Sequence, residues 1–350
     1  MDKVTLSIGN RRWQGWQSVN ITRSLGAVTG EYRISLTQKW RDAERLPIKE
    51  GMAAQVMIGS EVLATGYVAE RLPSYDGKSI NYEITCRDKT KDLVESSVLH
   101  ASGEWKDINL QAMANEICAP YGIGVVVETD IGAAFTTIRL EQGESGFELL
   151  ERLSRQRGVL LTSDANGNLV LTRGSKTKLA TRLELGKNIL AARGRFSEDS
   201  RFNQYIVKGV ADALDGWEPS QVSGNQVVIK DDLVQRYRPK IIITEEVFTA
   251  EGASRRGQWQ RQRAIGQSFS SEITVQGWQM PDGQLWPLNR RVDVVCPIQE
   301  LNHEMLISTV TFIEDDNGRV TVLNVVPPEA MDIPPEKAKP KDDTGWLSLG

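Results

Sequence analysis

Alternating hydrophobic and polar positions dominate the first part of the chain. The clearest run is residues 79–87, where every second side chain is apolar and falls on one face. About six such runs, separated by turn residues, predict strands: Val4–Ile8, Trp16–Thr22, Tyr32–Lys39, Ala54–Ile58, Val62–Val68 and Ser79–Arg87. Closely spaced short strands are typical of a small antiparallel barrel or sandwich. We prefer a barrel-like domain over residues 1–95, because closure removes exposed strand edges.

A charge-dense run, residues 87–92, follows the last of these strands. It contains no glycine-rich loop and no nearby nucleophile, so a phosphate-binding or catalytic site is disfavoured. We interpret it as the solvated start of a short helix that Asp88 caps.

After residue 96 the spacing of the apolar residues changes from a period of two, typical of strands, to about 3.6, typical of helices. Asn109 is placed to cap a helix that runs through Cys118. In residues 144–173, Ser145 and Glu148 have the spacing of a capping box at the start of a second helix. Two short strands then flank the turn-rich loop 164–168, which predicts a hairpin. Residues 96–184 are therefore expected to form a small α+β domain.

Strand patterning returns in residues 185–327. Asp315 to Gly318 is a strong hairpin signal between two long strands, which supports a second barrel-like domain. A polar helix is expected near residues 250–266, and its interior glycines mean that packing or a partner must hold it. Residues 328–350 are expected to be an extended or disordered tail in which Trp346 and Leu347 form a docking anchor. The predicted fold class is thus mixed β and α+β, with two small β-barrel-like domains flanking a small α+β domain.

The polar helix carries arginines around one tryptophan, which is the strongest candidate for a binding surface. Arginine and tryptophan are enriched at protein interfaces, and arginine beside an aromatic ring also binds nucleic acid. A solvated basic face is the third interpretation. The candidate interface residues are Arg255, Arg256, Trp259, Arg261 and Arg263.

Composition narrows the possible chemistry. The net charge of −4 argues against a protein that binds nucleic acid over its whole surface. No run approaches the ~20 apolar residues of a membrane span, so no membrane anchor is expected. Three cysteines (Cys86, Cys118 and Cys296) lie far apart in apolar patterns and are expected to be buried free thiols.

No catalytic, metal or cofactor residues are predicted. The two histidines, His100 and His303, have no convincing partner in the sequence, and the spacing of metal-binding motifs is absent. Loop 164–168 superficially resembles a calcium loop but lacks the terminal glutamate, so a hairpin turn is favoured. Glu141 and Glu144 lie near a helix start, where dipole and capping explain them. We expect no enzyme. A module that binds cell-wall glycan through residues 96–184 stays open as a function, and a cell-wall hydrolase is less favoured.

Several phrases, in order along residues 1–327, together closely resemble one family. Besides the stretch at 144–173, they are ITCRDKTKDLVESSV at 84–98, GEWKDINLQAMANEICAPYGIGV at 103–125, YIVKG at 205–209, RYRPKIII at 236–243 and DGQLWPLNRRVDV at 282–294. The family is that of the baseplate hub proteins of phage Mu and its prophage relatives, the P-type tail proteins of contractile tails.

The resemblance implies a homotrimeric ring at the centre of a contractile-tail baseplate. Two similar barrels per chain would present six near-equivalent units to the sixfold tail tube protein, while the threefold ring matches the trimeric central spike protein. DNA would pass through the channel on ejection, and other baseplate proteins would be neighbours. The protein is thus expected in the virion, assembled in the bacterial host cytoplasm. The family gives no binding residues to transfer individually.

Overall fold

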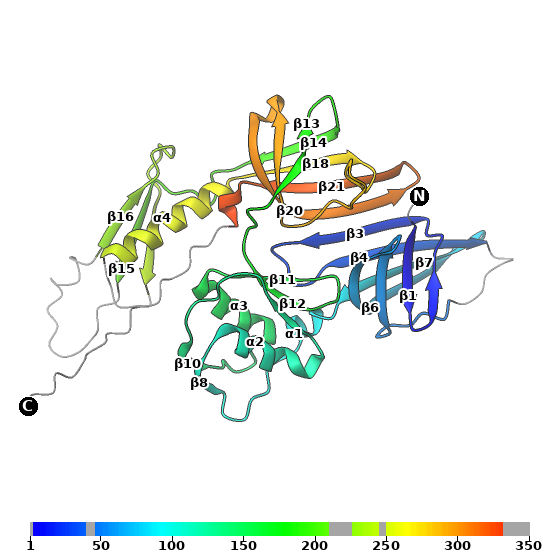
Figure 1. The fold of residues 1–350 in the computed structure, drawn as a ribbon, viewed down its shortest axis with the longest axis horizontal. Helices are drawn as coiled ribbons and strands as arrows, with labels where there is room; N and C mark the ends of the chain where they lie inside the picture. Colours follow the sequence, from blue (N-terminus) through cyan, green and yellow to red (C-terminus); the bar gives the residue numbers. More distant parts are fainter. Residues whose placement is uncertain (1–2, 40–45, 210–225, 245–249, 332–350) are drawn as a thin grey trace, which may run out of the picture.

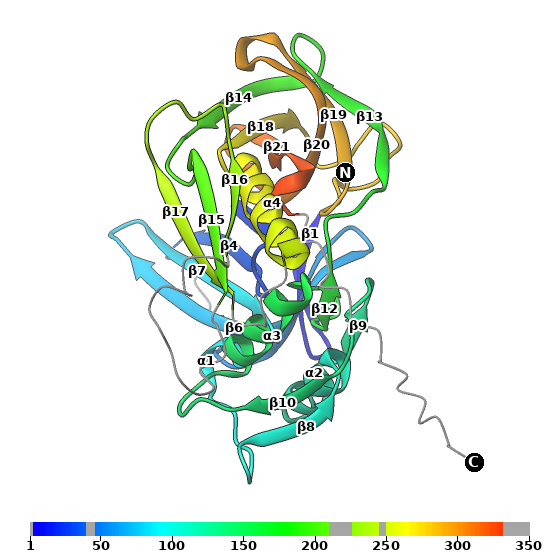
Figure 2. The same ribbon diagram turned by 90° about the vertical axis from the view of Figure 1, so that its left-hand side faces the viewer.

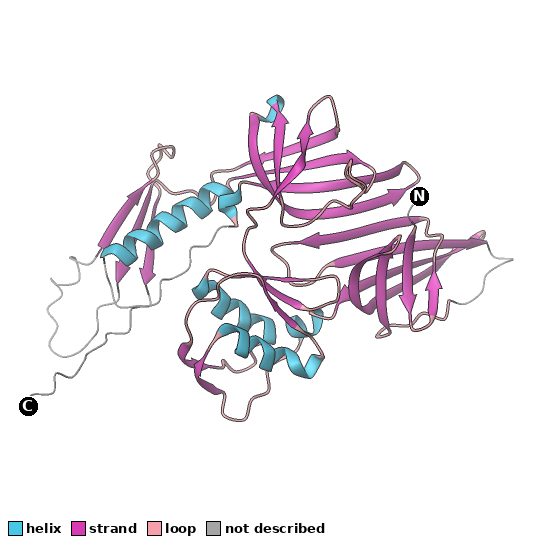
Figure 3. Ribbon diagram, viewed as in Figure 1, coloured by secondary structure: helices cyan, strands magenta, loops and turns pink. Residues whose placement is uncertain are grey.

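The computed structural model describes residues 3–39, 46–209, 226–244 and 250–331 (Figure 1). Its largest element is one sheet of thirteen strands, drawn from both ends of the chain. The strands are β1 (Val4–Ile8), β2 (Arg11–Trp13), β3 (Ser18–Ser24), β4 (Glu31–Lys39), β5 (Ala53–Ile58), β6 (Glu61–Tyr75), β7 (Ser79–Asp88), β13 (Lys178–Glu184), β14 (Ile189–Phe196), β18 (Phe269–Gln276), β19 (Arg291–Cys296), β20 (Leu301–Asp315) and β21 (Gly318–Val326). Figure 3 shows how strongly strands dominate the molecule.

The strand order corrects the expectation of two separate barrels. Hydrogen-bonded neighbours run β14-β18-β21-β20-β3-β4-β7-β6-β5-β1-β2, with β19 on β20 and β13 on β19. The N-terminal and C-terminal β-regions are therefore joined by β3 and β20, which pair from Thr309↔Ser24 to Glu314↔Val19. Their buried side chains form one continuous core. Among the described strands neither region closes into a barrel, and the outer edge of β3 pairs with β20 of the other region.

The middle of the chain folds as two layers, with helices over short strands. The helices are α1 (Lys91–Glu95), α2 (Leu110–Cys118) and α3 (Gly146–Arg157). A two-stranded sheet pairs β8 (Glu104–Ile108) with β10 (Phe135–Arg139), and a three-stranded sheet joins β9 (Val125–Val127), β11 (Leu160–Ser163) and β12 (Leu169–Thr172). This middle unit has its own hydrophobic core.

The predicted local signals of the middle unit are confirmed. The Asn109 side chain accepts a hydrogen bond from the Ala112 N–H at the start of α2. Ser145 and Glu148 form the full capping box of α3, and the helix ends at Gly158 with left-handed backbone. The β11–β12 hairpin follows as expected. These features are local, so the sequence alone specifies them.

A third unit departs from the expected second barrel. The strands β15 (Gln204–Gly209), β16 (Gln226–Lys230) and β17 (Pro239–Thr244) form a separate sheet, in the order β16-β15-β17. The helix α4 (Ala250–Gln267) covers one face of this sheet and has a small core of its own with it. In Figures 1 and 2 this unit projects beside the large sheet, with α4 leading back to it.

The junction between the middle unit and the N-terminal β-region is built around Asp88. Asp88 was expected to cap α1, but the structure corrects this role. The N-cap residue of α1 is Thr90, and Asp88 is 0% exposed. Its carboxylate accepts hydrogen bonds from Gly30 N–H at 2.8 Å, Tyr32 O–H at 2.9 Å and Ser163 Oγ–H at 2.7 Å. Ser163 belongs to β11, so one buried carboxylate links the middle hairpin to the large sheet.

The loop at the tip of the middle hairpin docks on the same sheet. The Thr65 hydroxyl of β6 donates to the Ala165 carbonyl oxygen at 2.9 Å. A Cβ on Gly167 would lie 2.4 Å from the Thr65 carbonyl oxygen, and this glycine also has a φ of +75°. Only glycine suits both the close approach and the left-handed backbone. The loop that resembles a calcium site is thus a contact between two units.

Candidate functional site

The candidate interface residues of α4 do not share one face. Arg256, Trp259 and Arg263 are spaced i, i+3 and i+7, and the two guanidinium groups lie 4.9 and 5.4 Å from the centre of the Trp259 ring. Arg261 lies on another side and donates to the Lys230 carbonyl oxygen of β16 at 3.1 Å. The Arg255 side chain lies outside the described residues. The structure therefore brings together three of the five candidates.

Close backbone approach explains the glycines that weaken α4. A Cβ on Gly257 would lie 2.6 Å from a side-chain carbon of Ile229 and 3.0 Å from one of Val207. A Cβ on Gly266 would lie 2.4 Å from the backbone of Ala330, in the short helix η5 (Pro328–Ala330). The helix is thus held by packing against its sheet and against η5, as its composition requires. Each of these two glycines lowers the intrinsic stability of the helix, but it permits a close contact that a larger residue would block.

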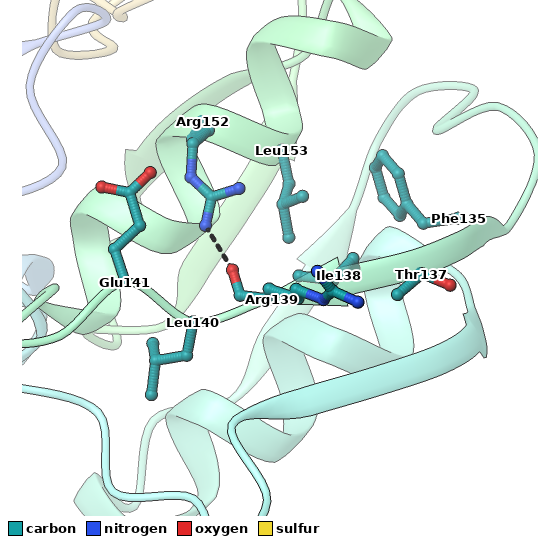
Figure 4. Close-up of a pocket in the computed structure, with 8 residues that line it drawn as sticks. All are labelled: Phe135, Thr137, Ile138, Arg139, Leu140, Glu141, Arg152 and Leu153. Atoms are coloured by element: carbon teal, nitrogen blue, oxygen red, sulfur yellow. Dashed lines mark hydrogen bonds between the residues drawn. The ribbon is translucent and has the colours of Figure 1, made fainter.

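The middle unit contains a surface hollow of about 560 Å³ between β10 and α3. Figure 4 shows Arg152 directed at the carbonyl oxygen of Arg139, which accepts its hydrogen bond at 3.1 Å. The same guanidinium makes two 2.9 Å hydrogen bonds to Glu144, which is 8% exposed. These polar groups satisfy one another.

The aromatic side of this hollow is also occupied. Phe135 is buried, and the Arg157 guanidinium lies 4.2 Å from the centre of its ring. Sugars bind proteins through an open aromatic face, and the lining residues offer none, because the Phe135 ring is buried and covered by Arg157. The glycan-binding alternative gains no support from the geometry.

The structure places one serine, one histidine and one carboxylate together. Ser102 Oγ is 3.3 Å from His100 Nδ1, and His100 Nε2 is 3.6 Å from Glu116. However, His100 Nδ1 accepts the Gly103 N–H at 3.0 Å, and Ser102 Oγ lies 3.0 Å from the Glu104 carbonyl oxygen, its hydrogen-bond acceptor. The single lone pair of Nδ1 is therefore already used, and the imidazole is not placed to take a proton from Ser102. The hydrogen bonds of His100 and Ser102 instead stabilise the loop that contains them.

The other chemical candidates are separated or already satisfied. His303 lies exposed on β20 and pairs with Val294 of β19, far along the chain from the first histidine. Glu144 is committed to Arg152, and its Oε2 also accepts the Glu141 N–H. Among the described residues, no group of three or more histidine, cysteine, aspartate or glutamate side chains is arranged to hold a metal ion.

The calcium-like loop uses its own carboxylate. Asp164 accepts hydrogen bonds from the N–H groups of Asn166 and Asn168 at 2.8 and 2.9 Å, and from the Asn168 side chain at 2.8 Å. This is the pattern of an Asx turn rather than that of a cation site.

The three cysteines are buried and free, as predicted. Burial raises the pKa of Cys86 and of Cys118 to about 12. A thiol with such a pKa is hardly ionised at neutral pH, so these two have little nucleophilic character. Within the described part of the chain, no helix is both long and apolar enough to cross a bilayer.

The chain matches three domain models along its length. Residues 3–88 match the Mu phage baseplate assembly protein GpP-like N-terminal domain, and residues 90–173 match the second domain of the gp44-like baseplate hub protein. Residues 249–334 match the fourth domain of the Mu phage baseplate assembly protein GpP.

One relative is similar to this chain along nearly its whole length. The baseplate hub protein gp44 of Escherichia phage Mu is 34% identical, over 99% of this chain and 93% of that protein. The chain belongs to the Mu baseplate hub protein family. The resemblance expected from the sequence is confirmed, and a structural role in a phage-type baseplate follows from it.

Solved structures agree with this membership of the hub family. The 43 kDa tail protein of prophage MuSo2 from Shewanella oneidensis is 47% identical, covers 95% of this chain and 100% of its own, and superimposes with a TM-score of 0.87. A tail protein from Neisseria meningitidis is 19% identical and has a TM-score of 0.79, over 94% of this chain and 99% of its own, which shows a shared fold.

Sequence reasoning missed the residues that hold the units of this hub protein together. Asp88 was assigned to a solvated helix start, although it is the buried link between two units. Its tyrosine and serine partners lie 56 and 75 residues away, so no local pattern reveals them. One signal was available in the sequence. Asp88 ends a strand of alternating pattern and falls on the same face as its apolar residues, which indicates burial.

Proposed function

We propose that the chain forms a homotrimeric ring at the centre of a contractile-tail baseplate, between the tail tube protein and the central spike protein. The observation that carries the proposal is the 34% identity to the Mu baseplate hub protein along nearly the whole chain. Two β-regions per chain support it, because three chains would then present six β-regions to a sixfold tube while keeping threefold closed symmetry towards the spike.

The third unit offers a surface suited to contact between subunits. The face of its sheet opposite α4 leaves Val228, Ile241 and Ile243 exposed by 42, 57 and 56%. Ile206 lies between Val228 and Ile241 in the strand register, so the apolar side chains form a continuous row. Exposed apolar rows on a sheet are typical of protein contacts. In this proposal a second copy of the chain covers the row.

The α4 residues offer a second contact surface on the other side of the same unit. Arg256 is exposed beside Trp259, and both residue types are common at interface centres. In this proposal the middle unit braces the N-terminal β-region, to which Ser163 and Ala165 bind it. The channel passes DNA during ejection, other baseplate proteins surround the ring, and the assembled virion forms in the host cytoplasm.

Mass measurement in solution tests the ring. Native mass spectrometry and light scattering should give about three times the chain mass of 39.0 kDa, and electron microscopy of the assembly should show a ring with a channel. A strict monomer at high concentration that binds neither the tube nor the spike protein would contradict the proposal. Clearing of a peptidoglycan gel by the pure protein would instead support a hydrolase.

A double substitution tests the proposed subunit surface. Val228→Lys with Ile241→Lys should shift the trimer to monomer, because two charges would be buried at the contact. The matched control is Leu99→Lys, which changes an apolar residue that is 97% exposed elsewhere and should leave the mass unchanged. Circular dichroism of each variant confirms that the fold is retained.

A further inference from the structure

A cleft of about 530 Å³ opens where the middle unit, α4 and the large sheet meet. One wall is the outer side of α3, and another is the last turn of α4, which lies beside η5 (Figure 1). Strands β14, β18 and β21 complete it, and Met331, the last described residue, lines its edge. The chain beyond Met331 therefore starts at the cleft itself.

Positive charge converges on this cleft from three different elements. Arg155 of α3, Arg195 of β14 and Arg263 of α4 all line it. Arg155 pairs with Glu151 at 2.6 Å, and Arg195 is 3.8 Å from Asp199 in a largely exposed pair. No carboxylate of the described residues lies within ion-pair distance of Arg263. Two carboxylates therefore face three guanidinium groups, and one of these pairs is long and solvent-screened.

Arg263 is in an unfavourable position without an anion. Its side chain is partly buried, and its guanidinium lies against the Trp259 ring. Burial, followed by the charges of Arg155 and Arg256, lowers the pKa of Arg263, and the Glu151 carboxylate offsets only part of this shift. A partly desolvated cation next to like charges costs free energy unless an anion approaches it.

The rest of the cleft is apolar. Apolar side chains form a hydrophobic wall beside the arginines, contributed by α3, the turn after it, β11, β18, β21 and the residue after η5: Phe147, Val159, Leu161, Phe269, Val326 and Met331. The complementary ligand is therefore a peptide with carboxylates next to large apolar side chains.

The chain itself contains such a segment. Asp342 and Asp343 are followed within four residues by Trp346 and Leu347. These residues lie outside the described part of the structure. Ten residues, 332–341, lie between Met331 and Asp342, so the eleven steps from one to the other span up to about 36 Å when extended and the segment reaches the cleft.

We propose that residues 342–347 bind in this cleft of their own chain, with Asp342 and Asp343 against Arg263 and Arg155 and with Trp346 and Leu347 on the apolar wall. A tether this short gives an effective concentration in the millimolar range, which favours the same copy over a neighbouring one. The proposal is independent of the trimeric ring, since it concerns contacts within one chain.

Disulfide trapping in the full-length protein tests the proposal. Gln267→Cys with Ser348→Cys places one thiol at the cleft and one beside the apolar pair, while the native cysteines are buried. We expect a crosslink within one chain to form at least about tenfold faster than in Lys78→Cys with Ser348→Cys, because binding raises the local thiol concentration. Lys78 is exposed in the β6–β7 turn, away from the cleft.

Charge variants make the test specific. Adding Asp342→Asn with Asp343→Asn, or Arg263→Gln, should slow trapping several-fold, as should 0.5 M salt, a concentration at which the screening length is only about 4 Å. The matched control, Lys337→Gln with Lys339→Gln, should leave the rate unchanged. A rate equal to that of the Lys78 pair, or one insensitive to the acidic and arginine changes, would overturn the proposal. Crosslinks mainly between chains would overturn the assignment to the same copy.

Discussion

Two of the junctions between the middle unit and the rest of the molecule are of opposite electrostatic character. At the first, one buried carboxylate, Asp88, accepts hydrogen bonds from Gly30, Tyr32 and Ser163. At the second, the cleft beside α4, the partly buried Arg263 has no carboxylate partner among the described residues. A buried carboxylate with three hydrogen-bond donors holds two units together, whereas a partly buried cation without an ion-pair partner at an open cleft can bind an anion.

The largest expected effect comes from disrupting the hydrophobic core of the middle unit, which takes part in both junctions. Leu150 is 1% exposed in the core of the middle unit. Leu150→Asp should lower the free energy of unfolding by more than about 4 kcal/mol and abolish trimer assembly, because it buries an unpaired carboxylate and removes a packed side chain. Urea unfolding and native mass measurement check this.

The control for Leu150→Asp is Asp164→Ala. It removes hydrogen bonds within an exposed turn, so about 1 kcal/mol or less should be lost and assembly should remain nearly intact. A larger loss of assembly for Asp164→Ala than for Leu150→Asp would return attention to a metal site in that loop.

The next largest effect comes from removing the Asp88 carboxylate at the first junction. Asp88→Ala should cost about 3 kcal/mol, because three buried donors lose their acceptor. Asp76 is the matched control: it also accepts hydrogen bonds from the Lys78 and Ser79 backbone, but in an exposed turn. Asp76→Ala should cost under about 1 kcal/mol in the same urea titration. Equal losses would mean that burial does not strengthen the Asp88 joint.

A smaller change tests one partner of that carboxylate. Tyr32 is 1% exposed, and its hydroxyl lies 2.9 and 3.0 Å from the two Asp88 oxygens. Tyr32→Phe keeps the packing and should cost about 1–2 kcal/mol. In the Asp88→Ala background the same change should cost almost nothing, since the shared interaction is already lost. Additive losses in the double-mutant cycle would refute a direct coupling.

The second junction should tolerate loss of its charge. Arg263→Gln should change the free energy of unfolding by no more than about 0.5 kcal/mol, because no buried carboxylate is left unpaired. Arg201 provides the contrast: it makes a bidentate pair with Asp231, which is 4% exposed, and Arg201→Gln should cost about 3 kcal/mol. If Arg263→Gln were as costly as Arg201→Gln, the two junctions would not differ as described.

The smallest effect is a pH dependence at the first junction. Burial raises the pKa of Asp88 above its ordinary value of 3.8, although three donors oppose the shift. An acid whose pKa is higher in the folded state contributes stability that is full below pH 3.8 and is lost as pH rises through the raised pKa. The stability advantage of the wild type over Asp88→Ala should therefore be larger at acid pH than at neutral pH. The opposite slope would show that the donors outweigh burial.

The sequence by itself determined the local elements. The capping box at Ser145 and Glu148, the Asn109 cap and the β11–β12 hairpin all follow from residues a few positions apart, and all were predicted. The family was also recognisable from the sequence. Of the candidate interface, helix α4 was predicted, but not which of its arginines share a side, because that depends on how the helix is seated on its sheet.

Only the tertiary structure decided how the elements combine. Alternation shows that β3 and β20 are strands but not that their edges pair, so one continuous sheet was taken for two barrels. Asp88 looked solvated because its partners are distant in sequence, and Gly257 looked like a helix defect until the close approach of β16 was visible. Helical periods, caps and turns arise from neighbours along the chain, whereas strand pairing and buried charge depend on neighbours in space.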